Sequence, residues 1–124
     1  MNTALWIAAI VLAAVFLFAG LAKLGQSRDK LVASGMGWAQ DADPTGIRLL
    51  GLLELLGAIG LVVPAWTKIR PDLVPWAATG LALTMVGAII VHLRRKEAPM
   101  IVINLVLLAA LVFVAWGRFG AHAF

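Results

Sequence analysis

The sequence contains no cysteine among its 124 residues. This absence excludes disulfide bonds, thiolate metal sites, iron–sulfur clusters and thiol redox chemistry. Charged residues are also scarce, at 13% of the chain, and they fall in short clusters between long apolar runs. So few polar side chains cannot coat a water-soluble domain. We therefore expect lipid to replace water around most of the chain.

Motifs of self-sufficient enzymes are missing as well: there is no HExxH, no glycine-rich phosphate loop and no nucleophile elbow. The two histidines, His92 and His122, are expected on opposite sides of the membrane, so they cannot share a haem within one chain. We therefore expect no metal site, no intrinsic cofactor and no self-sufficient enzyme. The net charge of +4 indicates basic membrane flanks, not nucleic-acid binding.

The chain instead has long hydrophobic stretches, with 63% hydrophobic residues and a mean hydropathy of +1.01. A membrane-crossing helix needs about 20 mostly apolar residues. Four stretches qualify, and together they predict an all-α integral membrane protein, a four-helix bundle forming a single domain over 1–124. The predicted spans are 3–22, 47–66, 73–93 and 98–117.

The connections predict how the spans are arranged. Short connections make the second and third spans, and the third and fourth, antiparallel neighbours. The first run exceeds the apolar region of a signal peptide and lacks a preceding basic segment, so we interpret it as a membrane helix. The long first connection mixes Leu31, Val32, Met36 and Trp38 with charges, which favours a short interfacial helix that ends by 41–44.

The distribution of basic residues predicts the orientation. Cytoplasmic connections of membrane proteins carry an excess of Lys and Arg. Seven basic residues lie on the side of the first and third connections and three on the other, so we expect both termini outside, in a bacterial cell membrane. The seven are Lys23, Arg28, Lys30, Arg48, Arg94, Arg95 and Lys96, and the three are Lys68, Arg70 and Arg118.

Four polar residues at or within the spans are the candidate site: Lys23, Glu54, His92 and Asn104. Polar side chains near the bilayer centre are costly, about 2.5 to 3.5 kcal/mol for charged ones, so each needs an explanation. Because successive spans run in opposite directions, all four residues belong to one half of the bilayer.

Helical spacing predicts which of these residues face the bundle. Gly80, Thr84, Ala88 and His92 are each four residues apart, which predicts a stripe of small residues that another helix can approach. Lys23 and Glu54 also have glycine or alanine at helical spacing, and the glycines beside Glu54 are interpreted as packing residues. Asn104 lacks small neighbours, so spacing supports its inward orientation least.

Two interpretations of these residues remain open. In the first, Glu54 forms an interior ion pair with Lys23 or Arg48 that fixes helix register. In the second, a carboxylate, an imidazole and an amine form a pocket for a polar headgroup, a quinone ring or a proton, with Arg48, Arg94 and Arg95 as a supporting basic loop.

Several segments together resemble the DoxX-like membrane proteins over nearly the whole chain: GLAKL, GLLELLGAIGLVVP, VHLRRKE and WGR. The resemblance implies a four-helix membrane bundle and an association with quinone-linked or other redox partners. The residues that match the family pattern are Lys23, Glu54, Pro64, His92, Arg94, Arg95 and Glu97.

The favoured hypothesis is a membrane subunit that works with a bound quinone or a redox partner. The alternative is a non-enzymatic scaffold or accessory subunit of a larger complex. A proton-coupled small-molecule transporter is disfavoured, because small multidrug transporters carry their glutamate in the first span and this chain has Glu54 in the second. Four short helices enclose little volume, so we expect a homo-oligomer or a larger membrane complex.

Overall fold

The computed structural model describes residues 2–33 and 44–120, and within these ranges all regular structure is helical. Four of the five helices are long and apolar enough to cross a membrane, which confirms the predicted all-α integral membrane fold. The helices are α1 (Asn2–Gly25), α2 (Arg28–Ala33), α3 (Pro44–Trp66), α4 (Leu73–Arg94) and α5 (Ala98–Phe119).

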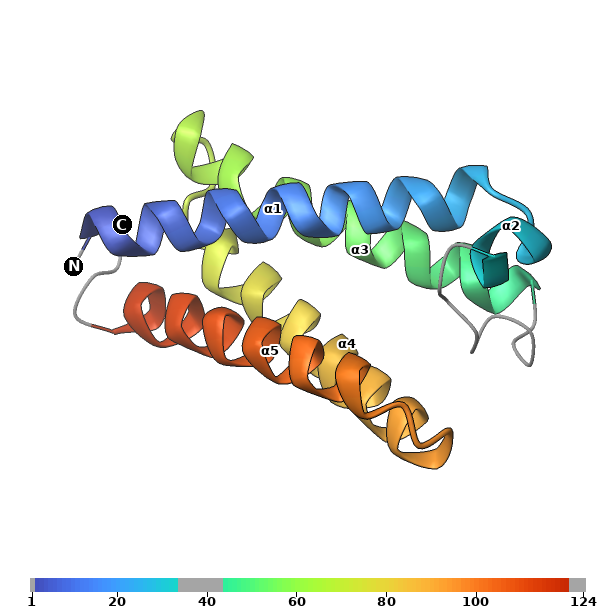
Figure 1. Cartoon of the computed structure of the whole chain (residues 1–124). Coiled ribbons are helices and arrows are strands. Elements are labelled where there is room, and N and C mark those ends of the chain that lie inside the picture. Colours follow the sequence, from blue (N-terminus) through green and yellow to red (C-terminus); the bar gives the residue numbers. More distant parts are fainter. Residues whose placement is uncertain (1, 34–43, 121–124) are drawn as a thin grey trace.

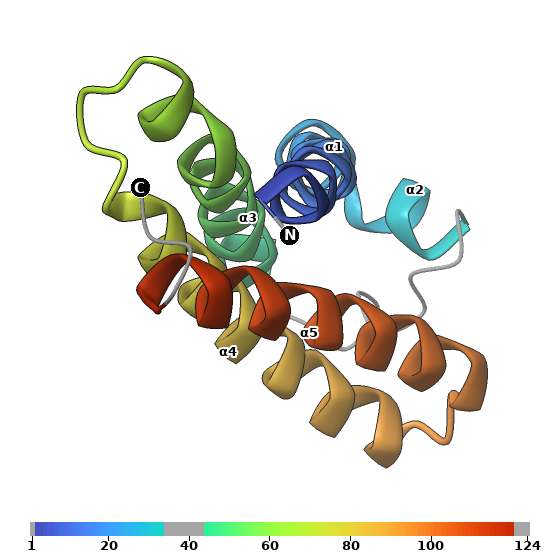
Figure 2. The same ribbon diagram turned by 90° about the vertical axis from the view of Figure 1, so that its left-hand side faces the viewer.

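The long helices form two antiparallel pairs, α1 with α3 and α4 with α5, and the pairs cross each other (Figures 1 and 2). At the left of Figure 1, the start of α1 lies beside the end of α5. Towards the right the two helices diverge, so that α2 and the α4–α5 turn lie far apart. We call the end where α1 lies beside α5 the closed end of the bundle, and the end where they diverge the splayed end.

At the closed end, Arg118 is buried and fastens α5 to α1. Its Nη1 donates a hydrogen bond to Asn2 Oδ1 at 2.6 Å, and its guanidinium lies 5.8 Å from the centroid of the Trp6 ring. The leucine side chain of Leu5 occupies the space beside Gly117. The sequence placed Arg118 among the charges that flank the spans, and the structure places it in the last turn of α5 with its side chain buried.

Two glycines allow a close approach between the backbones of α1 and α3. A Cβ on Gly20 would lie 2.7 Å from the backbone oxygen of Gly51 and 2.9 Å from the backbone nitrogen of Leu55. A Cβ on Gly51 would lie 2.8 Å from Lys23 Cβ. The prediction that the glycines near Glu54 serve packing is confirmed, since neither helix backbone has room for a methyl group here.

The predicted stripe on α4 is confirmed only in part. A Cβ on Gly80 would meet nothing within 4 Å, so no helix approaches there. Gly80 instead lies in a shallow apolar groove between α3 and α4, with Gly57, Gly60 and Ala77. Helical spacing correctly placed Ala88 and His92 on one inward face, where both line the cavity between the helix pairs, but it did not predict the open space beside Gly80.

The turn after α4 has the hydrogen bonds of a Schellman motif. The backbone N–H of Glu97 donates to the carbonyl of His92 at 2.9 Å, and that of Lys96 donates to Leu93 at 3.2 Å. Lys96 adopts the left-handed conformation, with φ of 57°, that this motif requires. In most such motifs the two residues that the turn brings together are apolar. Here they are His92 and Glu97.

In the first connection, α2 supplies a short helix where the sequence favours one, and its interfacial position stays a prediction. The predicted segment also includes Met36, Trp38 and 41–43, which lie outside the described residues, as does His122. Many large apolar side chains on the outer surface are exposed, including Trp66, Trp76 and Trp116. Such a surface suits a lipid environment, with tryptophans near the helix ends.

We expect Gly20→Ala to lower the thermal stability of the detergent-solubilised protein by about 1 to 3 kcal/mol, because the new methyl group would meet backbone atoms that cannot move independently. Circular dichroism during heating measures the effect. The matched controls are Gly80→Ala and Gly87→Ala in α4, where a Cβ meets open space. These should be neutral or stabilise by about 0.5 to 1 kcal/mol through helix propensity. Equal effects at all three positions would contradict the proposed close approach.

Candidate functional site

A cavity of about 510 Å³ lies between the two helix pairs, and all four long helices line it. Its walls are mostly apolar, with Phe16 of α1 and Met85 of α4 among them. Its lining also includes exposed side chains, namely Val15 of α1, Val91 of α4 and Ile103 of α5. The cavity therefore opens to the outside of the bundle where α1 and α5 diverge.

The four predicted polar residues all line this cavity: Lys23, Glu54, His92 and Asn104. Each comes from a different helix, and each is at least nine-tenths buried. The expectation that alternating spans bring them to one level of the bundle agrees with this placement. The structure thus places four polar residues that are far apart in the sequence around one cavity.

A buried ion pair joins α1 to α3. Lys23 Nζ lies 2.9 Å from Glu54 Oε1, and both side chains are less than a tenth exposed. The sequence left Lys23 and Arg48 as alternative partners of Glu54, and the structure selects Lys23, because Arg48 is exposed. The Gly20–Gly51 contact lies one helical turn before each charged residue and brings the two backbones close enough for the short lysine–glutamate distance.

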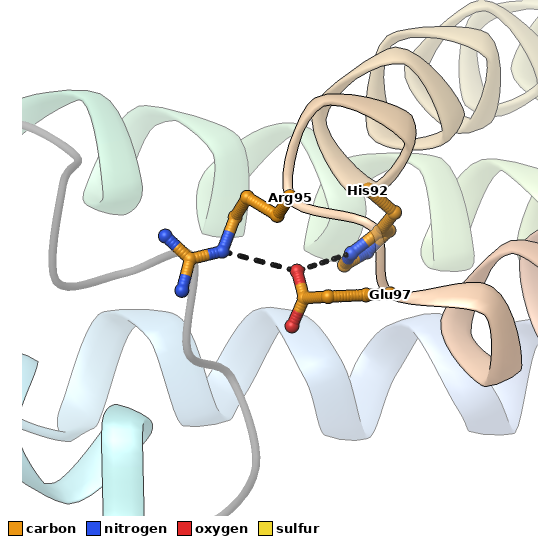
Figure 3. Close-up of polar contacts among 3 residues, drawn as sticks. All are labelled: His92, Arg95 and Glu97. Atoms are coloured by element: carbon orange, nitrogen blue, oxygen red, sulfur yellow. Dashed lines mark hydrogen bonds and ion pairs between the residues drawn. The ribbon is translucent and has the colours of Figure 1, made fainter.

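His92 is buried at the end of α4 and contacts a carboxylate in the following turn. Its Nδ1 lies 3.1 Å from Glu97 Oε1, and the same oxygen accepts a hydrogen bond from Arg95 Nε at 3.1 Å (Figure 3). These contacts hold the pKa of Glu97 below its usual range, and the hydrogen bond with His92 has the largest effect. An ionised carboxylate accepts only, so Nδ1 carries the proton. In the neutral ring, Nε2 is then an acceptor.

Asn104 is the one side chain among the described residues with a fully buried polar atom that lacks a hydrogen-bond partner. That atom is Nδ2, a donor, and the residue lines the cavity. Burying an unpaired amide costs about 1 to 3 kcal/mol, so a native protein usually satisfies it. Sequence spacing supported the inward orientation of Asn104 least, yet the structure buries this side chain and leaves its Nδ2 donor without a hydrogen-bond partner.

The basic loop residues do not join the cavity. Arg48 and Arg94 are exposed, and Arg95 contacts Glu97, whose carboxylate lies beside His92. Glu97 matches the family pattern but was not predicted as a site residue. A usable signal was its spacing of five residues from His92, because a Schellman turn after a helix that ends at Arg94 brings these two residues together.

The arrangement favours a ligand with a polar head and an apolar body. Lys23 and Asn104 offer donors, His92 offers either a donor or an acceptor, and the surrounding walls suit hydrocarbon. Among the described residues, no group of three or more metal-ligating side chains could hold a metal ion. The chemistry that these residues can supply is binding, charge compensation and proton exchange.

Comparison with known proteins gives one match. The model of the DoxX-like family matches residues 7–114, which includes all four cavity-lining polar residues. No curated protein matches the chain, and no solved structure does.

We expect Glu54→Gln to destabilise the protein by about 3 to 5 kcal/mol, because it removes the carboxylate that compensates the buried Lys23 ammonium. The double variant Lys23→Met with Glu54→Leu should recover most of this loss or exceed the wild type, since both charges are then gone. Thermal denaturation of the wild type, Glu54→Gln and the double variant in one detergent measures these differences in stability.

The control is Asp72→Asn, which removes a carboxylate from the exposed pair with Arg70. It should leave the melting temperature unchanged. If the double variant is as unstable as Glu54→Gln, the ion pair has a role in the fold beyond mutual charge compensation.

Proposed function

Because the chain belongs to the DoxX-like family of membrane proteins, we propose that it is a quinone-binding subunit that works with a redox partner. The quinone ring occupies the cavity between the helix pairs, and the isoprenoid tail leaves through the opening between α1 and α5. The observation that carries this proposal is the buried Asn104 Nδ2, a donor without a partner inside a mostly apolar cavity.

The chemistry of the cavity supports a quinone over a fully apolar occupant. A quinone carbonyl is an acceptor, so it satisfies the Asn104 amide and removes the cost of burying that donor. Lys23 and His92 are further polar contacts for the two carbonyl groups. A saturated hydrocarbon chain would leave Asn104 unsatisfied.

The size and position of the cavity also support this ligand class. Its volume of about 510 Å³ is within the usual range of about 300 to 1,000 Å³ for small-molecule sites. Exposed apolar side chains at its edge provide a surface for a lipid tail. A quinone could therefore enter from the bilayer without crossing water.

A redox role requires a partner, because the chain has no cysteine and the described residues contain no cluster that could hold a metal. Quinone reduction takes up two electrons, which must come from another redox protein. We accordingly propose that this chain is an accessory subunit that holds the quinone, and that the electron donor belongs to a larger membrane complex.

The alternative of a non-enzymatic scaffold has its own support in the Lys23–Glu54 pair. This pair and the Gly20–Gly51 contact fix the register of α1 against α3 whether or not a ligand binds. The two functions differ at Asn104. A scaffold gains nothing from an unsatisfied amide, whereas a binding site uses it.

Asn104→Leu separates the two functions, since leucine matches asparagine in size and needs no hydrogen bond. In quinone-free protein we expect it to raise the unfolding free energy by about 1 to 3 kcal/mol, because it removes the unsatisfied donor. In lipid nanodiscs we expect decyl-ubiquinone to bind about 3- to 10-fold more weakly, the equivalent of one lost hydrogen bond. Thermal unfolding without quinone measures the stability, and the shift of the melting temperature on adding decyl-ubiquinone measures the affinity.

The matched control is Val106→Leu, on an exposed face of the same helix. It should change neither stability nor binding. Quinone extracted from gently purified wild-type protein should exceed that from the Asn104→Leu protein. Phospholipid as the sole co-purifying molecule, with no response to decyl-ubiquinone, would favour the scaffold.

We also propose that the α4–α5 turn faces the cytoplasm and that both termini lie outside, from the excess of basic residues on that side. A phosphatase that is active only outside the cytoplasm should then be active when fused after Phe119 and inactive when fused after Lys96. Replacing Arg94, Arg95 and Lys96 with glutamine removes three positive charges and should weaken this preference. The opposite activity pattern in the wild type would contradict the orientation.

A further inference from the structure

Among the described residues, His92 both lines the cavity and contacts the turn after α4. Its ring is buried and lines the cavity, while its Nδ1 contacts Glu97. The Glu97 side chain is 23% exposed, so the carboxylate is within reach of water. Water, Glu97, His92 and the cavity are therefore arranged in series at this end of the bundle.

The Schellman turn fixes this arrangement. The backbone bond from Glu97 to the carbonyl of His92 spans 2.9 Å, and it holds the carboxylate beside the ring independently of the side-chain contact. Arg95 donates to the same carboxylate oxygen. Glu97 is thus oriented by its own backbone and by a neighbouring guanidinium, and it is available to a protonated imidazole.

On the basis of the proposed function, we propose that ligand binding takes up one proton at His92. In the bound state the doubly protonated ring donates from Nδ1 to Glu97 and from Nε2 to an acceptor oxygen of the ligand. The added proton goes to Nε2, because Nδ1 already carries one, and it comes from the surrounding water. No bond of the ligand breaks, and the imidazole becomes an imidazolium compensated by the Glu97 carboxylate.

In this proposal the charge changes at His92, which is surrounded by the following charged and polar groups. From α1 and α3 it is faced by Lys23 and Glu54, which compensate each other at 2.9 Å. From α5 the polar group is Asn104, which does not titrate. From the turn come Arg95 and Glu97, and the contacts of Glu97 keep it ionised at pH values where a free carboxyl begins to protonate.

The sign of the pH dependence follows from this linkage. A ligand that prefers the protonated ring binds more tightly as the pH falls, and the preference is lost as the pH rises and His92 becomes neutral. Histidine is the side chain that ordinarily changes charge between pH 5 and 8. We expect the dissociation constant of decyl-ubiquinone to fall by about five- to tenfold between pH 8 and pH 6, the response to one proton.

The experiment measures decyl-ubiquinone affinity in nanodiscs at several pH values for the wild type and three variants. His92→Gln keeps a polar side chain without a titrating ring, so affinity should become nearly independent of pH. Glu97→Gln removes the compensating carboxylate and should shift the rise in affinity to lower pH. Asp72→Asn, which removes a carboxylate at the opposite end of the spans, should reproduce the wild-type profile.

The possible outcomes separate the two proposals. Binding that is strong but independent of pH in the wild type would overturn proton uptake and leave the quinone site standing. A pH response that survives His92→Gln would likewise overturn it. Absence of binding at every pH would remove the quinone site and the proton uptake together. If His92→Gln does not fold, the wild-type profile and the shift in Glu97→Gln still decide the question.

Discussion

The structure depends on one constraint, that hydrocarbon offers no partner to a polar group. Every charge or amide within the spans must therefore be satisfied by another part of the chain or by a ligand. Lys23 and Glu54 meet the constraint through each other at 2.9 Å, and this requires α1 and α3 to approach at Gly20 and Gly51. Packing and charge compensation are here a single feature, because neither helix could move away without separating the ion pair.

The two ends of the bundle meet the same constraint in different ways. At the closed end, the buried Arg118 uses Asn2 and the face of Trp6, and α1 lies against α5. At the splayed end, α1 and α5 diverge and a cavity remains, in which Asn104 Nδ2 has no partner within the described part of the chain. The fold is thus complete at one end and leaves a place for a molecule at the other.

The turn between α4 and α5 connects that place to water. A Schellman motif is a common way to end a helix, and its two facing residues are usually apolar. With His92 and Glu97 in those positions, the turn places a carboxylate beside the ring, and the proposed proton uptake uses this carboxylate to compensate the imidazolium. The DoxX-like fold, the cavity and this turn are the features on which the proposal of a quinone-binding subunit is based.

Much of the fold was predictable from the sequence, because hydropathy is a sum over neighbouring residues and needs no knowledge of packing. It identified four membrane helices, and the alternation of their directions brought Lys23, Glu54, His92 and Asn104 to one level. Tertiary structure alone decided that Glu54 pairs with Lys23 and not Arg48, that Arg118 is buried, and that Gly80 faces no helix. These outcomes depend on how each helix is rotated and where the two pairs cross, which is set by contacts between residues far apart in the chain.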